Sequence, residues 1–354
     1  VNALADPKKH PRLKAEGTWK IAKSGDHYDR LRVQASSSET FDTDMMRLAS
    51  VALPLLYSSL PTGAEAIQQA MATYEQALKC LKKPGLLFEL GRRYFWGDDK
   101  DGKASDLLAK AVGKTQKKKG ISSADNGTVI GLASDEEISL AFRPAKVKTA
   151  ADIEKLQNIM AALWDREESD FEIDIVSGME MLQSKGFEAI RDRVKNTDLQ
   201  AGQYDSNPLH SAPKLVATVA KKHKVSEEAA ALYLQLLALA DPTTANLKKW
   251  NDWSAAQITK AGKELLGKKL VLQAKRSRAG RNLFIPGGWE AFKLPHLPIE
   301  SWKLPLFQVE RSESLSRPNM PLNRILPLQP IPDLFQAAWK RTLDGDAPGY
   351  EEVK

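Results

Sequence analysis

Hydrophobic positions in the first third of the chain follow mainly helical spacing. Four elements are predicted there: a β-hairpin over 19–33 and helices over 42–60, 63–85 and 103–114. Pro54 is expected to kink or split its helix, because proline removes a backbone hydrogen bond and its ring clashes with the preceding turn. Residues 1–114 are therefore interpreted as a mostly helical region.

The periodicity changes after the exposed link at residues 115–120. The sequence predicts two paired strands over 127–134 and 137–147, a helix over 150–165, a strand over 170–177 and a helix or helix pair over 178–196. In the predicted strand at 170–177, Phe171, Ile173 and Ile175 share one face. Residues 121–196 are interpreted as a small α/β unit, which a turn-rich stretch at 197–212 ends.

The next part of the chain alternates helices with short breaks and ends in a hairpin. Helices are predicted within 211–224, 226–240, 243–250 and 254–266. The hairpin at 268–289 is expected to turn Leu270, Leu272, Leu283 and Ile285 toward the core. Its connecting residues, 274–282, are called the wing loop below.

A proline-rich segment, residues 290–354, follows the hairpin. Leu, Ile, Phe and Trp are interspersed with the prolines, so an extended strap that packs over other parts of the chain is expected, ending in a helix at 333–343. This segment is called the C-terminal strap. The predicted fold class is a helix-rich, multi-domain α/β protein with regions 1–114, 121–196, 213–289 and 290–354.

Positive charge is concentrated in one short stretch. Residues 248–281 contain seven lysines and three arginines against one aspartate and one glutamate, a net charge of +8, whereas the whole chain carries +7. The rest of the protein is therefore close to neutral. A local basic segment of this kind favours an anionic partner such as nucleic acid.

Residues 213–289 resemble the winged helix-turn-helix superfamily, in the style of GntR-type regulators. The matching positions are Leu247, Trp250, Ser254, Ile258, Ala261, Leu265, Leu270, Val271, Gly280, Arg281, Phe284 and Ile285. The sequence departs from the pattern at the turn, where Asp252 stands for a glycine, and at Lys248, where a small residue is expected. The resemblance implies that the helix starting at Ser254 enters the major groove of duplex DNA.

The resemblance also implies which side chains meet DNA. Gln257 would contact an adenine edge, whereas Lys260 and Lys263 would contact phosphates. The complete set of predicted nucleic-acid-binding residues is Ser254, Gln257, Thr259, Lys260, Lys263, Lys275, Arg276, Arg278 and Arg281. Neutralising Arg276, Arg278 and Arg281 together is expected to abolish binding without unfolding the protein.

A protein-interaction role is the alternative, because winged helices also serve as scaffolds. In that case the winged helix would bind a protein partner, upstream domains of the same polypeptide or the C-terminal strap. Burial of Lys260 and Lys263 under the strap would then exclude insertion into a DNA groove.

Other function classes find little support in the sequence. Neither a catalytic motif nor a metal or cofactor site is predicted, because the five histidines are scattered and the carboxylates of 121–196 form no recognised pattern. No apolar run approaches the ~20 residues that span a bilayer, so no membrane partner is expected. The single cysteine, Cys80, fits a reducing compartment. The chain is expected to be part of a larger cytoplasmic, bacterial-type protein with a regulatory or defence role.

Overall fold

The structure is a computed structural model that describes residues 6, 8, 19–23, 31–35, 41, 43–95, 102–118, 120–164, 173–310 and 318–349. The chain divides into two compact units, the first made of 1–50 and 69–183 and the second of 51–68 and 184–354. Helices α2 (Thr43–Ser59) and α3 (Glu65–Leu81) contribute residues to both. None of the helices within the described ranges has the length and apolar character needed to cross a membrane.

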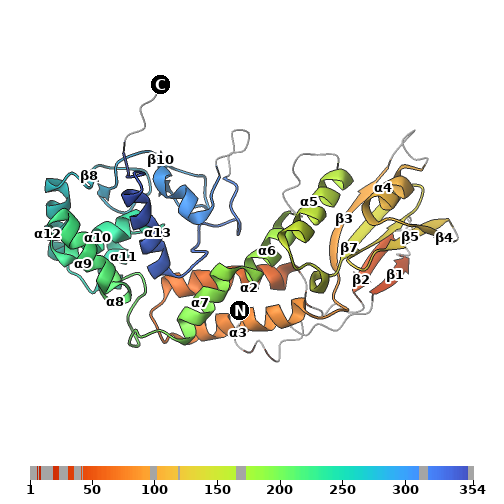
Figure 1. Ribbon diagram of the computed structural model, residues 1–354, viewed down its shortest axis with the longest axis horizontal. Helices are drawn as coiled ribbons and strands as arrows, with labels where there is room; N and C mark the ends of the chain where they lie inside the picture. The colour runs from red at the N-terminus through yellow and green to blue at the C-terminus, as the bar shows by residue number, and fades with distance from the viewer. Residues whose placement is uncertain are drawn as a thin grey trace, which may run out of the picture. The chain divides into compact units, whose positions relative to one another are not determined.

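An antiparallel sheet of five strands forms the centre of the first unit (Figure 1). In spatial order the strands are β3 (Phe88–Tyr94), β7 (Glu137–Phe142), β6 (Val129–Ala133), β5 (Ile121–Asp125) and β4 (Gln116–Lys118). The other elements of this unit are β1 (Trp19–Lys23), β2 (Leu31–Ala35), α4 (Lys103–Val112), the 3-10 helix η3 (Pro144–Lys146), α5 (Ala150–Trp164) and α6 (Ile173–Gln183).

Several sequence predictions for this unit are confirmed. The hairpin β1–β2 and the strand pair β6–β7 form as expected, and β6 and β7 are buried along their whole length. The split of the helix at Pro54, one of the two predicted outcomes, is not found, because α2 continues through Pro54 from Thr43 to Ser59. Residues 116–118, expected to be an exposed link, are exposed but pair with β5 as an edge strand.

The strand predicted over 170–177 is wrong. Ile173 and Ile175 belong to helix α6, and Phe171 lies outside the described residues. The apolar residues of α6 continue through Val176, Met179 and Leu182, which are all buried. The alternation of Phe171, Ile173 and Ile175 favoured a strand, whereas the buried residues from Ile175 to Leu182 follow the spacing of one helical face.

The second unit is mainly helical. Its helices are α7 (Lys185–Lys195), α8 (Pro208–Ser211), α9 (Pro213–His223), α10 (Glu227–Ala238), α11 (Thr244–Asn251), α12 (Ala255–Gly267), the 3-10 helix η4 (Ser301–Phe307) and α13 (Ile331–Leu343). Two short hairpins complete it: β8 (Leu272–Gln273) with β9 (Leu283–Phe284), and β10 (Trp289–Glu290) with β11 (Ile299–Glu300).

Helix α10 is the core of this unit. Every residue from Ala229 to Ala238 is buried, and α8, α9, α12 and α13 pack around the helix. Its one polar side chain in that stretch, Gln235, exchanges amide hydrogen bonds with Asn251 at 2.9 Å in each direction. The predicted terminal helix is confirmed as α13, and most described residues of the strap between 318 and 330 are buried.

The two compact units follow different boundaries from the four predicted regions. Strand β3 comes from the segment that was interpreted as mostly helical, yet it pairs with β7 at one edge of the sheet. Helix α7, assigned from the sequence to the region 121–196, belongs to the second unit. Both differences arise from long-range packing, which local periodicity does not encode.

Candidate nucleic-acid interface

A tight turn at Asp252 and Trp253 joins helices α11 and α12. Asp252 adopts the left-handed conformation, with φ 54° and ψ 43°, at the position where a glycine was expected. Aspartate tolerates this conformation better than most residues. Trp250 and Trp253 flank the turn and are 9% and 8% exposed, which confirms that they fill the core between the helices.

Ser254 caps α12 as predicted, and Gln257 completes the cap. The Ser254 hydroxyl accepts a hydrogen bond from the Gln257 backbone N–H, and the Ser254 backbone N–H donates to Gln257 Oε1 at 2.8 Å. The Ser254 hydroxyl also donates to the same Oε1 at 2.9 Å. This reciprocal capping box satisfies two free N–H groups of the helix end. A two-bond contact from Gln257 to adenine would require Oε1 to leave the cap.

The remaining predicted residues of α12 lie on its outer face. Lys260 and Lys263 are exposed, and in the described part of the chain neither forms an ion pair. Thr259 is exposed as well, with its hydroxyl donating to the Ala255 carbonyl at 2.9 Å. Burial of the two lysines under the C-terminal strap, the observation that would have excluded groove insertion, is not found.

The inner face of α12 packs closely on α10 and on the hairpin. Ile258, Ala261 and Leu265 are buried, and Gly262 allows Leu283 to approach so closely that an added Cβ would lie 2.6 Å from Leu283 Cδ1. Glu264 accepts hydrogen bonds from both the backbone N–H and the hydroxyl of Ser226, the residue that caps α10. The helix is thus fixed in orientation, with the lysines outward.

Regular pairing in the hairpin is shorter than the sequence suggested. Only Leu272–Gln273 and Leu283–Phe284 pair. The expected inward alternation fails in the first strand, where Val271 is buried while Leu270 and Leu272 are half-buried. With so short a ladder, period-two alternation does not fix the direction of the neighbouring side chains.

Gly280 makes the turn of the wing loop, as predicted. Its φ is 62°, and its carbonyl accepts a hydrogen bond from the backbone N–H of Thr244 at 3.0 Å. An added Cβ would lie 2.8 Å from Thr243 Cγ2, so a side chain at this position would be strained both by backbone conformation and by contact.

Two of the wing arginines bind carbonyl groups of the same chain. Arg276 donates to Gly287 O at 2.9 Å and to Gly288 O at 3.4 Å, with its guanidinium over the rings of Phe284 and Trp289. Arg278 donates to His296 O at 3.2 Å and to Phe292 O. Lys275 is exposed. The predicted contacts of these two arginines with nucleic acid therefore compete with carbonyl acceptors in the strap and just before it.

Arg281 is buried, which corrects its predicted role. Its side chain is 3% exposed and pairs with Glu300 at 2.5 Å, and Glu300 pairs with Lys303 at 3.0 Å. These three residues are called the buried ion cluster. Lys303 also donates to Leu239 O at 2.7 Å. A guanidinium enclosed in this way cannot reach a phosphate, so Arg281 is not part of the interface in this structure.

The electrostatics of the buried ion cluster follow from its desolvation. Burial lowers the pKa of Lys303 to about 8, although the charge of Glu300 acts in the opposite direction. Burial by itself would raise the pKa of Glu300, but the charges of Lys303 and Arg281 outweigh it and the pKa is lowered. In this cluster one carboxylate lies between two basic side chains.

Sequence inspection missed both the cluster and further exposed cations. Glu300 and Lys303 are three residues apart in a proline-rich stretch, where a charged pair gives no sign of burial. Lys268 and Lys269 are exposed just beyond α12, and Lys248 is exposed on α11. The available signal was that all three lysines belong to the basic segment 248–281.

Within the ranges that the structure describes, no group of three or more His, Cys, Asp and Glu side chains is placed to hold a metal ion. The candidate interface is therefore made of the exposed cations and the cap of α12, beside a wing loop that binds its own chain. In comparisons with protein-family models, curated proteins and solved structures, no match to this chain was found.

Proposed function

We propose that the second unit binds duplex DNA as a winged helix, with the outer face of α12 in the major groove. One observation carries the proposal: Lys260 and Lys263 are exposed on a helix whose opposite face is fixed in the core. Phosphate contacts from lysines give affinity that is independent of sequence, so the proposal concerns DNA in general and not one operator.

Further support comes from the surroundings of α12. Lys268 and Lys269, just beyond the C-terminal end of α12, and Lys248 on α11 are further exposed cations of the same segment. The one glutamate of α12, Glu264, is bound to Ser226 and does not oppose these cations on the outer face. The cap at Ser254 presents a helix N-terminus, which favours a phosphate through its free N–H groups and dipole.

The wing loop has a different role in this proposal. Arg276, Arg278 and Arg281 hold residues 287–300 to the hairpin, so only Lys275 among the wing cations is assigned to DNA. The triple arginine variant is consequently unsuited to testing DNA binding, because it would remove interactions that stabilise the fold.

The test is binding of the full chain to a fluorescent duplex, measured by anisotropy over a series of salt concentrations. The variant Lys260→Glu/Lys263→Glu should weaken binding and reduce the slope of log K against log salt by about 1.8, roughly 0.9 for each phosphate that the lysines no longer neutralise. The charge-matched control is Lys117→Glu/Lys118→Glu on the exposed strand β4, which should bind as the unmodified chain does.

Two results would refute the proposal. Equal binding by the α12 variant and the β4 control would show that α12 is not the surface that meets DNA. Absence of salt-dependent duplex binding by the unmodified chain would remove DNA as the partner altogether.

A protein scaffold is the second candidate function, and the wing loop is the observation that favours it. Its arginines already bind the same chain, which is a scaffold-like use of the hairpin. In this case the exposed lysines of α12 would meet an acidic protein surface. The anisotropy measurements separate the two candidates, because salt-dependent binding of the fluorescent duplex is expected for a DNA-binding protein and not for a protein scaffold.

A further inference from the structure

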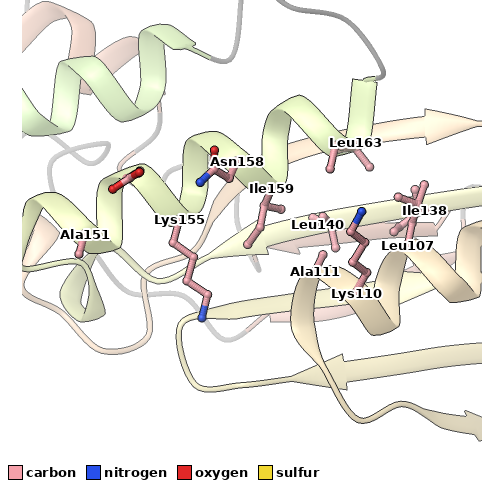
Figure 2. Close-up of a pocket in the computed structure, with 12 residues that line it drawn as sticks. Leu107, Lys110, Ala111, Ile138, Leu140, Ala151, Lys155, Asn158, Ile159 and Leu163 are labelled. Atoms are coloured by element: carbon pink, nitrogen blue, oxygen red, sulfur yellow. The ribbon is translucent and has the colours of Figure 1, made fainter.

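A groove crosses one face of the sheet in the first unit, between α4 and α5 (Figure 2). Helix α4 is held over the neighbouring strands because Gly131 of β6 has no side chain: an added Cβ would lie 2.4 Å from Leu108 Cδ1. The end of α5 is held over the other edge, where Arg93 of β3 donates to Leu163 O at 3.1 Å. Strand β7 lies between these two attachments, in contact with α4, and its residues are buried.

The floor and walls of the groove are apolar. Ile138 and Leu140 of β7 lie beneath the groove and are almost completely buried; Leu107 and Ala111 line it on the α4 side, and Ile159 and Leu163 on the α5 side. The cavity volume is about 410 Å³, within the range of about 300–1,000 Å³ that is usual for small-molecule sites. Such a lining offers no hydrogen-bond partner, so it favours a hydrocarbon.

The groove is long and narrow. The α5 residues that line it run from Ala151 to Leu163 with spacings of three and four, so they form one stripe along the helix. At 1.5 Å per residue this stripe is about 18 Å long. A linear chain fits such a slot better than a compact ring system does.

Two lysines border the opening from opposite walls. Lys110 extends from α4 and Lys155 from α5, each toward the other side of the groove (Figure 2). Both are exposed, and among the described residues neither forms an ion pair. Glu154 and Asn158 also line the rim. With two ammonium groups against one carboxylate, the rim favours an anionic headgroup.

We propose that this groove binds a linear aliphatic monocarboxylate, with its chain between α4 and α5 against Leu107, Ala111 and Ile159 and its carboxylate at Lys110 or Lys155. The site shares no residue with the proposed DNA interface. It combines an apolar slot for the chain with cations at the rim for the headgroup, which are the two features that recognition of this ligand class needs.

The experiment is calorimetric titration of the full chain with a series of linear carboxylates from hexanoate to dodecanoate, each below its micelle concentration. Affinity should rise about fourfold for each added methylene until the groove is filled. The alcohol of the same length should bind more weakly, and the trimethylammonium analogue more weakly still.

Two variants locate the site. Ala111→Phe places a ring in the groove from a half-exposed wall position and should reduce carboxylate affinity at least tenfold. Lys110→Gln/Lys155→Gln should remove the preference for carboxylate over alcohol while leaving alcohol binding unchanged. Circular dichroism and thermal melting confirm that each variant is folded.

The proposal is overturned if no carboxylate of the series binds, if Ala111→Phe binds as the unmodified chain does, or if the trimethylammonium analogue binds as tightly as the carboxylate. Chain-length dependence together with weakened binding in Ala111→Phe supports it.

Discussion

Helix α12 and the wing loop are both rich in cations and lie close together in the sequence, yet the structure uses their charges differently. Lys260 and Lys263 of α12 point outward, without an ion pair in the described part of the chain. The wing arginines bind carbonyl groups or a carboxylate of their own chain.

The difference follows from backbone geometry. In a helix the backbone groups are already paired, and the inner face of α12 fixes Lys260 and Lys263 on the opposite side. The loop lies beside a strap with few regular hydrogen bonds, whose carbonyl oxygens accept from arginine. Guanidinium groups suit this role because they carry five donors in a planar fork. Cations of one sequence segment are therefore placed in two ways here: the lysines of α12 are exposed, and the arginines of the wing loop fasten the chain to itself.

The largest effect is expected when the carboxylate of the buried ion cluster is removed. Glu300→Gln leaves Arg281 and Lys303 buried without a counter-charge, so it is expected to lower the free energy of unfolding by about 3–5 kcal/mol. Lys303→Met should cost less, because Arg281 still neutralises Glu300. Urea denaturation measures both.

The exposed Glu228→Gln serves as the control and should stay close to the unmodified chain. If Glu300→Gln were no less stable than this control, the buried ion cluster would not fasten the strap. Arg281 of the wing loop would then have no stabilising role that distinguishes it from the lysines of α12.

A smaller effect is expected from the two arginines that bind backbone carbonyls. Arg276→Gln/Arg278→Gln should lower the free energy of unfolding by about 1–3 kcal/mol, because these carbonyls lose charged donors. The salt slope of DNA binding should remain that of the unmodified chain. A reduced salt slope of DNA binding, with an unchanged free energy of unfolding, would indicate that these arginines contact DNA and not their own chain.

The smallest predicted effect concerns His223, at the end of α9. Burial, and then the charge of Lys222, lower its pKa, and its ring contacts Tyr233 and Trp339 edge-on. The folded state thus favours the neutral ring. Its contribution to stability is present above the ordinary histidine pKa of about 6.5 and is lost as the pH falls below that value, through the folded pKa.

Replacement by an uncharged ring tests this assignment. His223→Phe should flatten the decrease in unfolding free energy between pH 7 and 5, measured by urea denaturation at several pH values. The same change at the exposed His210 should leave the decrease as it is. Equal slopes for the unmodified chain and His223→Phe would contradict the prediction.

Much of the local structure was predictable from the sequence. The helix caps at Ser226, Thr243 and Ser254, the hairpin turn at Gly280 and the terminal helix α13 all follow from residue types with strong local preferences. Residues 173–177 were misassigned as part of a strand, because Phe171, Ile173 and Ile175 alternate over a stretch too short to show the helical period. Strand β3 was missed, because its partner β7 lies more than forty residues further along the chain.

For the candidate interface, the sequence is sufficient to show that Ser254 caps α12 and that Lys260 and Lys263 share one face of it, since both follow from capping and helical spacing. The tertiary structure is needed to see that Arg281 is buried with Glu300 and Lys303, and that Gln257 Oε1 accepts a hydrogen bond from the capping residue Ser254. The physical reason is that a side chain's partner depends on which distant groups folding brings within hydrogen-bond reach, and local sequence fixes only the face from which it starts.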